Sequence, residues 1–309
     1  MGRTEIPSPP DRPEKGGGSL MKSEGMTGNG LRRPVLAVLT VLAAGAWLGA
    51  SNCATNGLDP LVSWADHDNT NADTIDHAAW QAVLDGYLRT DDPSGVHLFD
   101  YGGLKANGAD RGRLQGYIAH LEGVDPRRYS RDEQMAYWIN FYNALTVETV
   151  VEEYPVDSIK KIHEGIVPLS GPWGDRRATV AGQRLTLDNM EHDILRALWR
   201  DPRIHYAVNC ASIGCPNLMP TVFTAANLEE MMDAAARAYI NHPRGVELLD
   251  EAFGVVSSIY TWFQEDFGGS ETGVVEHLLL YAEPELAEQL RSFEGGFDYE
   301  YDWDLNDAS

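Results

Sequence analysis

The sequence predicts an α+β fold, a helix-rich single domain packed around a small, mostly antiparallel sheet. Apolar residues recur every three to four positions in several segments, which is typical of amphipathic helices. Short alternating runs bounded by turn residues indicate a few strands. The chain has 309 residues and no internal repeat. Because the strands are few and do not alternate regularly with the helices, the pattern favours α+β over α/β.

Composition divides the chain into four parts. Residues 1–30 are rich in Gly, Pro, Ser and charge, so we expect a disordered tail or a mis-assigned start. Residues 31–53 have the pattern of an export signal or a lipoprotein-type anchor. Residues 54–74 lack an apolar period and are expected to be a linker. Residues 75–309 are expected to form the folded domain.

The export prediction depends on a basic start followed by an apolar run. Arg32 and Arg33 precede an apolar segment over 34–50, and Cys53 follows in a sequence that resembles a lipoprotein cleavage box. An uncleaved anchor is the alternative. We therefore expect the protein in the periplasm or cell envelope, in contact with the membrane only through this anchor or a lipid.

Charge restricts the class of partner. The chain carries 47 Asp and Glu against 24 Lys and Arg, a net charge of −23. Such a chain repels phosphate backbones, so nucleic acid is excluded as a ligand. A small molecule or a peptide of unknown identity is the expected substrate. The sequence contains no P-loop, dinucleotide fingerprint or calcium loop, so no cofactor and no metal are expected.

The best-defined helix is expected between Ser130 and Pro155. Ser130 and Glu133 have the spacing of a capping box, and Pro155 cannot continue a helix. Asn140 and Asn143 lie within this helix. Their amides either bind nearby backbone or face a pocket, because a buried amide without a partner is costly. Before this helix we expect helices over 76–89 and 110–121, and a loop over 91–108.

The second half alternates short helices and strands. Asp188 and Glu191 have capping-box spacing at the start of a helix that ends at Asp201-Pro202. An apolar run over 204–208 follows and is expected to be a strand. The remaining expected elements are a hairpin over 178–180 and 183–185, strands over 246–249 and 254–257, helices over 227–240, 259–267, 274–281 and 284–290, and a strand at a sheet edge within 299–305.

The segment His205–Pro216 is where chemistry is expected. It reads His-Tyr-Ala-Val-Asn-Cys-Ala-Ser-Ile-Gly-Cys-Pro and holds two of the three cysteines. Nucleophilic groups at the end of a rigid element are typical of active sites. We therefore expect Cys210 to attack a carbonyl group and a histidine to accept the proton.

Residues around this segment have expected roles in the thiol hypothesis. His205 is the nearest base in sequence, and Glu191 and His192 could orient or replace it. Asn209 or Asn140 is expected to bind the oxyanion. The full prediction names Cys210, His205, Asn209, Glu191 and His192 as catalytic, and Asn140, Asn143, Ser212 and Cys215 as substrate-binding.

Two alternatives use the same residues. A disulfide between Cys210 and Cys215 would fix the loop of a non-catalytic envelope binding domain. Alternatively, His205 and both cysteines could bind a metal, although their spacing matches no standard zinc motif. Trp173, Trp262 and Trp303 are expected in the core, with a pocket wall as the alternative.

Several segments together resemble the domain-of-unknown-function 547 family. The resemblance extends from about residue 75 to the C-terminus and implies the domain assignment. It implies no reaction and no catalytic residues. The segments that carry it are 137–144 (YWINFYNA), 187–196 (LDNMEHDILR), 201–212 (DPRIHYAVNCAS), 262–268 and 301–306 (YDWDLN).

Overall fold

A computed structural model describes residues 63–162, 171–249 and 252–309. The predictions for residues 1–30, for the export segment 31–53 and for the linker up to residue 62 lie outside the described residues. Residues 63–74 form no helix or strand. They nevertheless pack on the domain, since Trp64 lies edge-on to Trp138 with ring centroids 5.2 Å apart.

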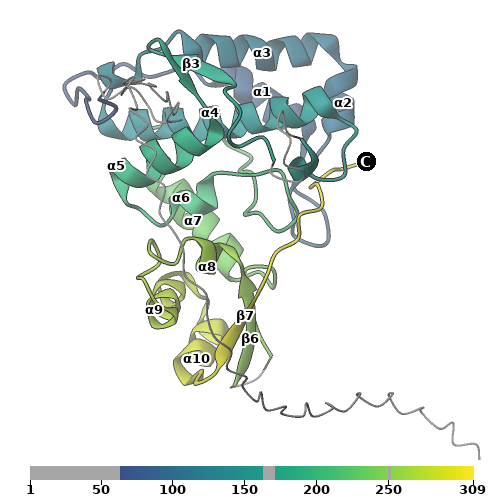
Figure 1. Ribbon diagram of the computed structural model, residues 1–309, viewed down its shortest axis with the longest axis vertical. Helices are drawn as coiled ribbons and strands as arrows, with labels where there is room; N and C mark the ends of the chain where they lie inside the picture. The colour runs from purple at the N-terminus through teal and green to yellow at the C-terminus, as the bar shows by residue number, and fades with distance from the viewer. Residues whose placement is uncertain (1–62, 163–170, 250–251) are drawn as a thin grey trace, which may run out of the picture. The chain divides into compact units, whose positions relative to one another are not determined.

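The described residues form a helix-rich α+β fold, which confirms the predicted class (Figure 1). None of these helices has the length and apolar character needed to cross a membrane. The helices are α1 (Ala78–Tyr87), α2 (Tyr101–Ala106), α3 (Gly108–Glu122), α4 (Arg131–Glu153), η3 (Asn189–Arg196), α5 (Ala197–Trp199), α6 (Ile204–Ala207), α7 (Leu228–Ile240), α8 (Ile259–Trp262), α9 (Glu271–Tyr281) and α10 (Pro284–Ser292), with short 3-10 turns η1 (Pro126–Arg128) and η2 (Ile159–Lys161).

The described strands form three small sheets. β1 (Leu88–Arg89) pairs with β2 (Leu98–Phe99), and β3 (Ala178–Val180) pairs with β4 (Gln183–Leu185), both antiparallel. The third sheet has the order β5 (Val246–Leu248), β6 (Phe253–Ser257), β7 (Gly296–Glu300). The β5–β6 pair is antiparallel, whereas β7 adds to β6 in parallel. The strand expected within 299–305 therefore occurs at a sheet edge but begins earlier in the chain.

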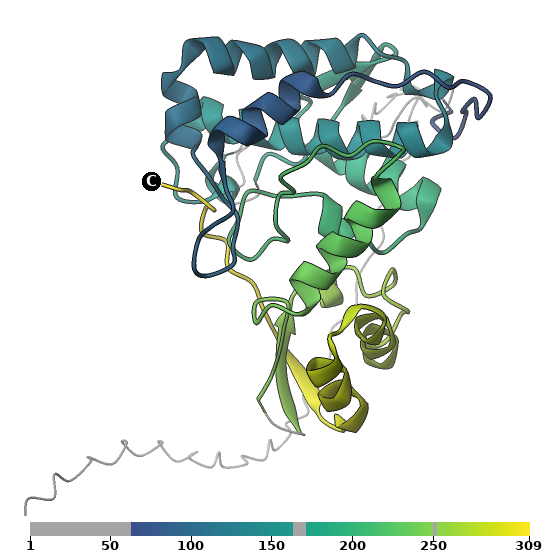
Figure 2. The same ribbon diagram turned by 180° about the vertical axis from the view of Figure 1, so that it is seen from behind.

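Two buried clusters organise the domain. The first core consists of apolar residues from α1 to α6 and includes the buried helix α4. The second core lies among α7, α8, α9, α10 and the third sheet. Helix α7 contributes to both, with Met232 in the first core and Tyr239 in the second. Figure 2 shows α7 running from the helices α1–α4 toward the third sheet.

Helix starts differ from the predictions in two places. Ser130 caps α4 by accepting a hydrogen bond from the Glu133 amide. The Glu133 carboxylate, however, reaches away and accepts from the amides of Ile75 at 2.6 Å and Ala225 at 3.2 Å. A buried carboxylate here ties two distant segments to α4 instead of completing a capping box.

The second capping box lies two residues before its predicted position. Asp188 makes no capping hydrogen bond. Instead, the Asn189 amide donates to the Thr186 hydroxyl at 3.0 Å, and the Thr186 amide donates to the Asn189 side chain at 3.1 Å. This reciprocal pair frees the Asp188 side chain, which lines the cavity described below.

Two further predictions were wrong. The loop predicted over 91–108 contains helix α2, which Asp100 caps through the Gly103 amide. The strand predicted over 204–208 is the short helix α6. Its apolar run suits burial in either conformation, and periodicity over five residues cannot separate the two.

Candidate functional site

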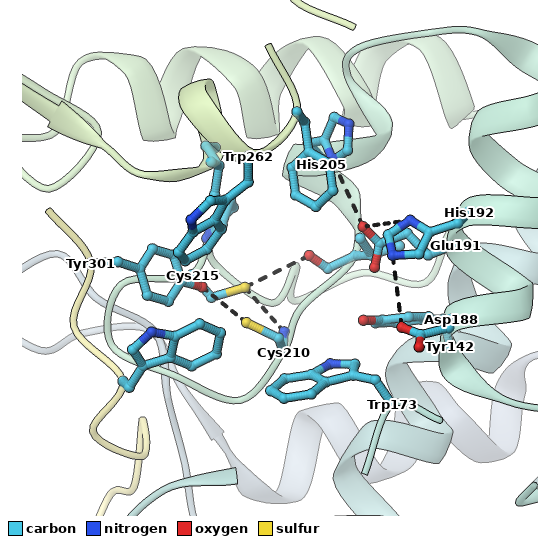
Figure 3. A pocket seen from close by; sticks show the side chains of 15 residues that line it. Tyr142, Trp173, Asp188, Glu191, His192, His205, Cys210, Cys215, Trp262 and Tyr301 are labelled. Carbon is cyan, nitrogen blue, oxygen red and sulfur yellow. Dashed lines mark hydrogen bonds and ion pairs between the residues drawn. The ribbon is translucent and has the colours of Figure 1, made fainter. Parts of the chain in front are cut away.

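Helix α6 and the turn after it bring the predicted site residues between the two cores. Ile204 and Ala207 are buried in the first core, and Tyr206 is buried in the second. Since the segment is helical at His205, the alternation of faces expected for a strand does not hold. His205 and the cysteines therefore lie on opposite sides of the cavity shown in Figure 3.

The loop that carries the cysteines is closed by Asn209. Its side-chain nitrogen donates to the Pro216 carbonyl at 2.8 Å, and its side-chain oxygen accepts from the Ala211 amide at 2.8 Å. Ala211 has φ +58°, a left-handed conformation that costs energy for a residue with a Cβ atom. The loop thus holds Cys210 in a defined, strained turn, and the Asn209 amide is used within the loop.

The C-terminal tail fixes the same loop from outside. The amides of Ile213 and Gly214 donate to the carbonyls of Asp304 and Asp302, both at 2.8 Å. A Cβ atom on Gly214 would lie 2.7 Å from the Asp302 amide nitrogen, so the close approach requires glycine. This pairing brings Tyr301 over Cys210.

The side chains of Asn140 and Asn143 both hydrogen-bond to backbone groups. The Asn140 amide donates to the Phe223 carbonyl at 2.7 Å and accepts from the Phe223 amide at 3.1 Å. Asn143 donates to the Ala207 carbonyl at 2.9 Å and accepts from the Asn209 amide at 2.8 Å. Neither side chain lines the cavity. Of the two readings, the structure therefore favours amides that bind nearby backbone.

The sulfur of Cys210 is surrounded by hydrogen-bonding groups. It lies 3.0 Å from the Tyr301 hydroxyl and 3.3 Å from the Ser212 hydroxyl. Its own backbone amide donates to the Cys215 sulfur at 3.0 Å. Ser212 is almost fully buried and also contacts the Tyr301 hydroxyl at 3.1 Å. Ser212 therefore contacts the Cys210 sulfur from a buried position. The sequence predicted a contact with substrate instead.

These donors favour a thiolate on Cys210. A hydrogen bond from the Cys215 thiol lowers the pKa of Cys210 most, burial opposes it, and hydrogen bonds from Ser212 and Tyr301 lower the pKa further. Burial, together with the hydrogen bond and charge of Cys210, raises the pKa of Cys215 well above its usual value. The pKa values of the two thiols are therefore shifted in opposite directions, with Cys210 the more readily ionised of the pair.

His205 is held on the far side of the cavity. Its Nε2 lies 2.6 Å from the Asp266 carboxylate, and its Nδ1 lies 3.8 Å from the Glu191 carboxylate. Its ring stacks on Phe263 with centroids 4.1 Å apart. No histidine is among the hydrogen-bonding partners of Cys210 in the part of the chain that the structure describes. The direct Cys210–His205 pair expected from the sequence is therefore not formed.

Asp266 is the group that fixes His205. Burial alone would raise its pKa, but hydrogen bonds from His205 and from Arg196, at 2.6 Å each, hold the pKa well below the usual value. The aspartate therefore stays charged and orients the imidazole.

His192 is the more accessible imidazole. It lines the cavity beside Glu191 and Asp188, with its nitrogens 3.9 Å and 3.7 Å from these carboxylates. Its side chain is 37% exposed, against 2% for His205. Burial raises the pKa of Asp188, opposed by His192. The π-helix η3 contains both Glu191 and His192, which line the cavity. Segments of π-helix occur frequently at functional sites.

Aromatic side chains complete the cavity, which has a volume of about 190 Å³. Trp262 was expected in the core but is 48% exposed. It stacks near Trp303 at 5.6 Å and contacts Tyr301 at 4.8 Å. Trp173 meets Trp303 edge-on at 5.6 Å. Three tryptophans thus wall a cavity with sulfur on one side and imidazole and carboxylate on the other (Figure 3).

The structure also bears on the two alternatives to the thiol hypothesis, a disulfide and a metal site. Cys210 and Cys215 are free thiols. Among the described residues, no three His, Cys, Asp or Glu side chains are arranged to hold a metal ion. The loop obtains its rigidity from Asn209 and the C-terminal tail.

Sequence reasoning did not assign four residues of this site. Asp188 was expected only as a cap, and Phe263 only as part of a helix. Tyr301 lies in a tail whose alternation of aromatic and acidic residues could have suggested a role beyond a sheet edge. Asp266, which lies 61 positions after His205, gives no signal in the sequence.

Comparison with known proteins gives one match. The model of the family described as "Protein of unknown function, DUF547" matches residues 126–240. No curated protein and no solved structure matches the chain. The matched region contains both cysteines, Glu191 and His192, whereas Trp262 and Tyr301 follow it.

Proposed function

Since residues 126–240 belong to the DUF547 family, whose function is unknown, we propose a function from the site itself: a thiol-dependent hydrolase or acyltransferase with Cys210 as the nucleophile. The observation that carries the proposal is the surroundings of the Cys210 sulfur. It lines a cavity and contacts the hydroxyls of Tyr301 and Ser212 at 3.0 and 3.3 Å. Stabilised thiolates of this kind are the reactive form of cysteine.

In the proposed reaction the Cys210 thiolate attacks a carbonyl carbon. A carbon–sulfur bond forms, the bond to the leaving group breaks, and the leaving group takes a proton from protonated His192. A water or a second nucleophile then attacks the thioester and gives its proton to His192, and the thiolate leaves. Acid and base catalysis by one residue of this kind is common in acyl transfer.

His192 replaces His205 as the histidine of this proposal. His205 is nearly inaccessible and is bound to Asp266 at 2.6 Å. His192 lines the cavity, with its nitrogens 3.7 and 3.9 Å from the carboxylates of Asp188 and Glu191. We assign no oxyanion donor to Asn209 or Asn140, because neither lines the cavity and each donates to a backbone carbonyl, that of Pro216 or Phe223.

The experiment is acylation with an activated ester, p-nitrophenyl acetate, followed by intact mass and peptide mapping. We expect an acetyl group on Cys210 in the wild type and none in Cys210→Ala, a loss of at least about a thousandfold in rate. Asp298→Asn is the matched control, because Asp298 is exposed on β7, which contributes no residue to the cavity.

A lack of reactivity at Cys210 would contradict the proposal. If Cys210 is inert toward the ester and toward iodoacetamide at neutral pH, the enzyme proposal is wrong, and a non-catalytic envelope binding domain is the better reading. Such a domain with a disulfide between Cys210 and Cys215 would also be two hydrogens lighter by non-reducing mass spectrometry.

Export is part of this proposal. It is supported by the basic and apolar pattern of residues 31–53. Fractionation of the native host with mass spectrometry of the N-terminus tests it. A chain that begins at a lipidated Cys53 or is retained by 34–50 supports export, and an intact chain in the cytosol contradicts it.

A further inference from the structure

The charge of the cavity identifies the class of substrate that the proposed reaction would take. Its lining contains two carboxylates, Asp188 and Glu191, and two imidazoles, His192 and His205. Among the described residues, no lysine or arginine lines this cavity. With a thiolate on Cys210, the lining carries more potential negative than positive charge, which disfavours an anionic ligand.

Glu191 is a buried carboxylate that none of the described lysines or arginines pairs with. It is only 8% exposed, and its side chain lines the cavity. The imidazole nitrogens nearest to its carboxylate stand at 3.8 and 3.9 Å, beyond normal hydrogen-bond length. The Tyr142 hydroxyl also faces this carboxylate. A buried carboxylate is costly without a paired cation, and the described residues bring no lysine or arginine to this one.

The aromatic wall of the cavity also favours a cation. Trp173, Trp262 and Trp303 present aromatic rings to the cavity. Indole faces attract ammonium groups through the negative face of the ring. Trp303 already accepts one cation, since the Lys160 ammonium lies 4.8 Å from its ring centre. Likewise, Arg196 lies 4.8 Å over Phe263 while paired with Asp266.

We propose that the acyl substrate carries a positively charged ammonium group, held between Glu191 and the tryptophan wall while Cys210 attacks its carbonyl. The inference rests on the proposed function for its acyl group, but the charge selectivity of the cavity can be measured without any turnover. Aromatic and carboxylate walls together select ammonium over neutral and anionic analogues of the same size.

The experiment uses two thiosulfonate reagents with the same reactive group and opposite charge. These are 2-(trimethylammonium)ethyl and 2-sulfonatoethyl methanethiosulfonate. In each reaction the Cys210 thiolate forms a disulfide with the reagent and releases methanesulfinate. Rates are measured on the full chain by intact mass, and the modified cysteine is located by peptide mapping. We expect the cationic reagent to react at Cys210 about tenfold faster than the anionic one.

Variants separate the cavity from the general acidity of the chain. Glu191→Gln and Asp188→Asn should each lower the cation-to-anion rate ratio by about threefold, whereas Asp298→Asn should leave it unchanged. Thermal unfolding verifies that each variant is folded. If Glu191→Gln does not fold, Asp188→Asn alone decides. The contribution of the exposed surface is removed by repeating the measurement at high salt.

The outcomes for the two proposals are distinguishable. Equal rates for the two reagents, a faster anionic reagent, or a ratio that neither variant changes overturns the ammonium proposal even if an acetyl enzyme forms. Cys210 that reacts with neither reagent overturns it too, because a substrate of similar size could not reach the sulfur. A cation preference lost in Glu191→Gln supports it even if the ester experiment fails.

Discussion

The two sides of the cavity stabilise charge in different ways. On one side, neutral groups surround an ionisable sulfur: Tyr301, Ser212 and the Cys215 thiol all hydrogen-bond to Cys210. On the other side, imidazoles lie against carboxylates, as His205 does against Asp266. The thiolate therefore does not need a histidine in contact with it, and the two histidines are free to differ in role.

On the histidine side of the cavity, His205 and His192 differ in their exposure and in their contacts. His205 is buried, stacked on Phe263 and bound to Asp266. His192 is over one-third exposed and stands between two carboxylates at 3.7 and 3.9 Å. His192 also has the Arg196 guanidinium 3.2 Å from its Nδ1, so its exposure to the cavity, and not a lack of partners, distinguishes it from His205. An imidazole open to the cavity is able to exchange protons with a ligand.

Among the substitutions that test the difference between the two histidines, the largest expected effect comes from His192. We expect His192→Gln to lower turnover of p-nitrophenyl acetate by about a hundredfold, because thioester hydrolysis loses its base. Formation of the acetyl enzyme should fall less, since the thiolate is stabilised by hydroxyls. Burst kinetics with intact mass separates the two steps. Unchanged turnover would remove His192 from the reaction and leave the two histidines without the proposed difference.

His205 should affect stability more than rate. His205→Gln removes the partner of Asp266 and part of the stacking on Phe263, so we expect a loss of about 2–3 kcal/mol in the free energy of unfolding. Alkylation of Cys210 by iodoacetamide should stay within about threefold of the wild type. Urea denaturation and alkylation rates test both statements. A large fall in alkylation with intact stability would restore His205 as the base.

Periodicity and turn chemistry were sufficient to predict most of the fold. The hairpin at 178–185, the helix start at Ser130 and the end of α7 near His242-Pro243 follow from local signals. The errors occur where tertiary contacts decide. Glu133 leaves its capping position to bind two remote amides. The apolar run at 204–208 is helical and buried, and burial alone does not separate a helix from a strand.

The site was predictable in composition but not in geometry. The cluster of Cys, His and Ser after residue 204 pointed to Cys210, and η3 supplied Glu191 and His192 as expected neighbours. Asp266 and Phe263 determine which of the two histidines is accessible from the cavity. Tyr301, which contacts the Cys210 sulfur, lies 91 positions away in the sequence. Spacing along a chain carries no information on pairs formed by folding across such separations.

The smallest expected effect is that of Tyr301→Phe, which tests how the Cys210 thiolate is stabilised. Burial raises the pKa of Tyr301 well above its usual value, so its hydroxyl remains a neutral donor to Cys210. Tyr301→Phe removes this donor but keeps the ring against Trp262 and Trp303. Because the hydrogen bond favours the thiolate, its loss should raise the pKa of Cys210. The pH at half-maximal alkylation should then move upward, and the rate near neutral pH should fall by about three- to tenfold.

Tyr299→Phe is the matched control for this substitution. Tyr299 lies two residues earlier and hydrogen-bonds to Glu271 on α9, outside the cavity. Its removal should leave the alkylation profile of Cys210 in place. At pH values above the pKa of Cys210 in both proteins, Tyr301→Phe should react as fast as the wild type, since both are then thiolates. A rate deficit that persists at high pH would mean that the hydroxyl positions the sulfur without lowering its pKa, and the account of a thiolate held by neutral donors would then be wrong.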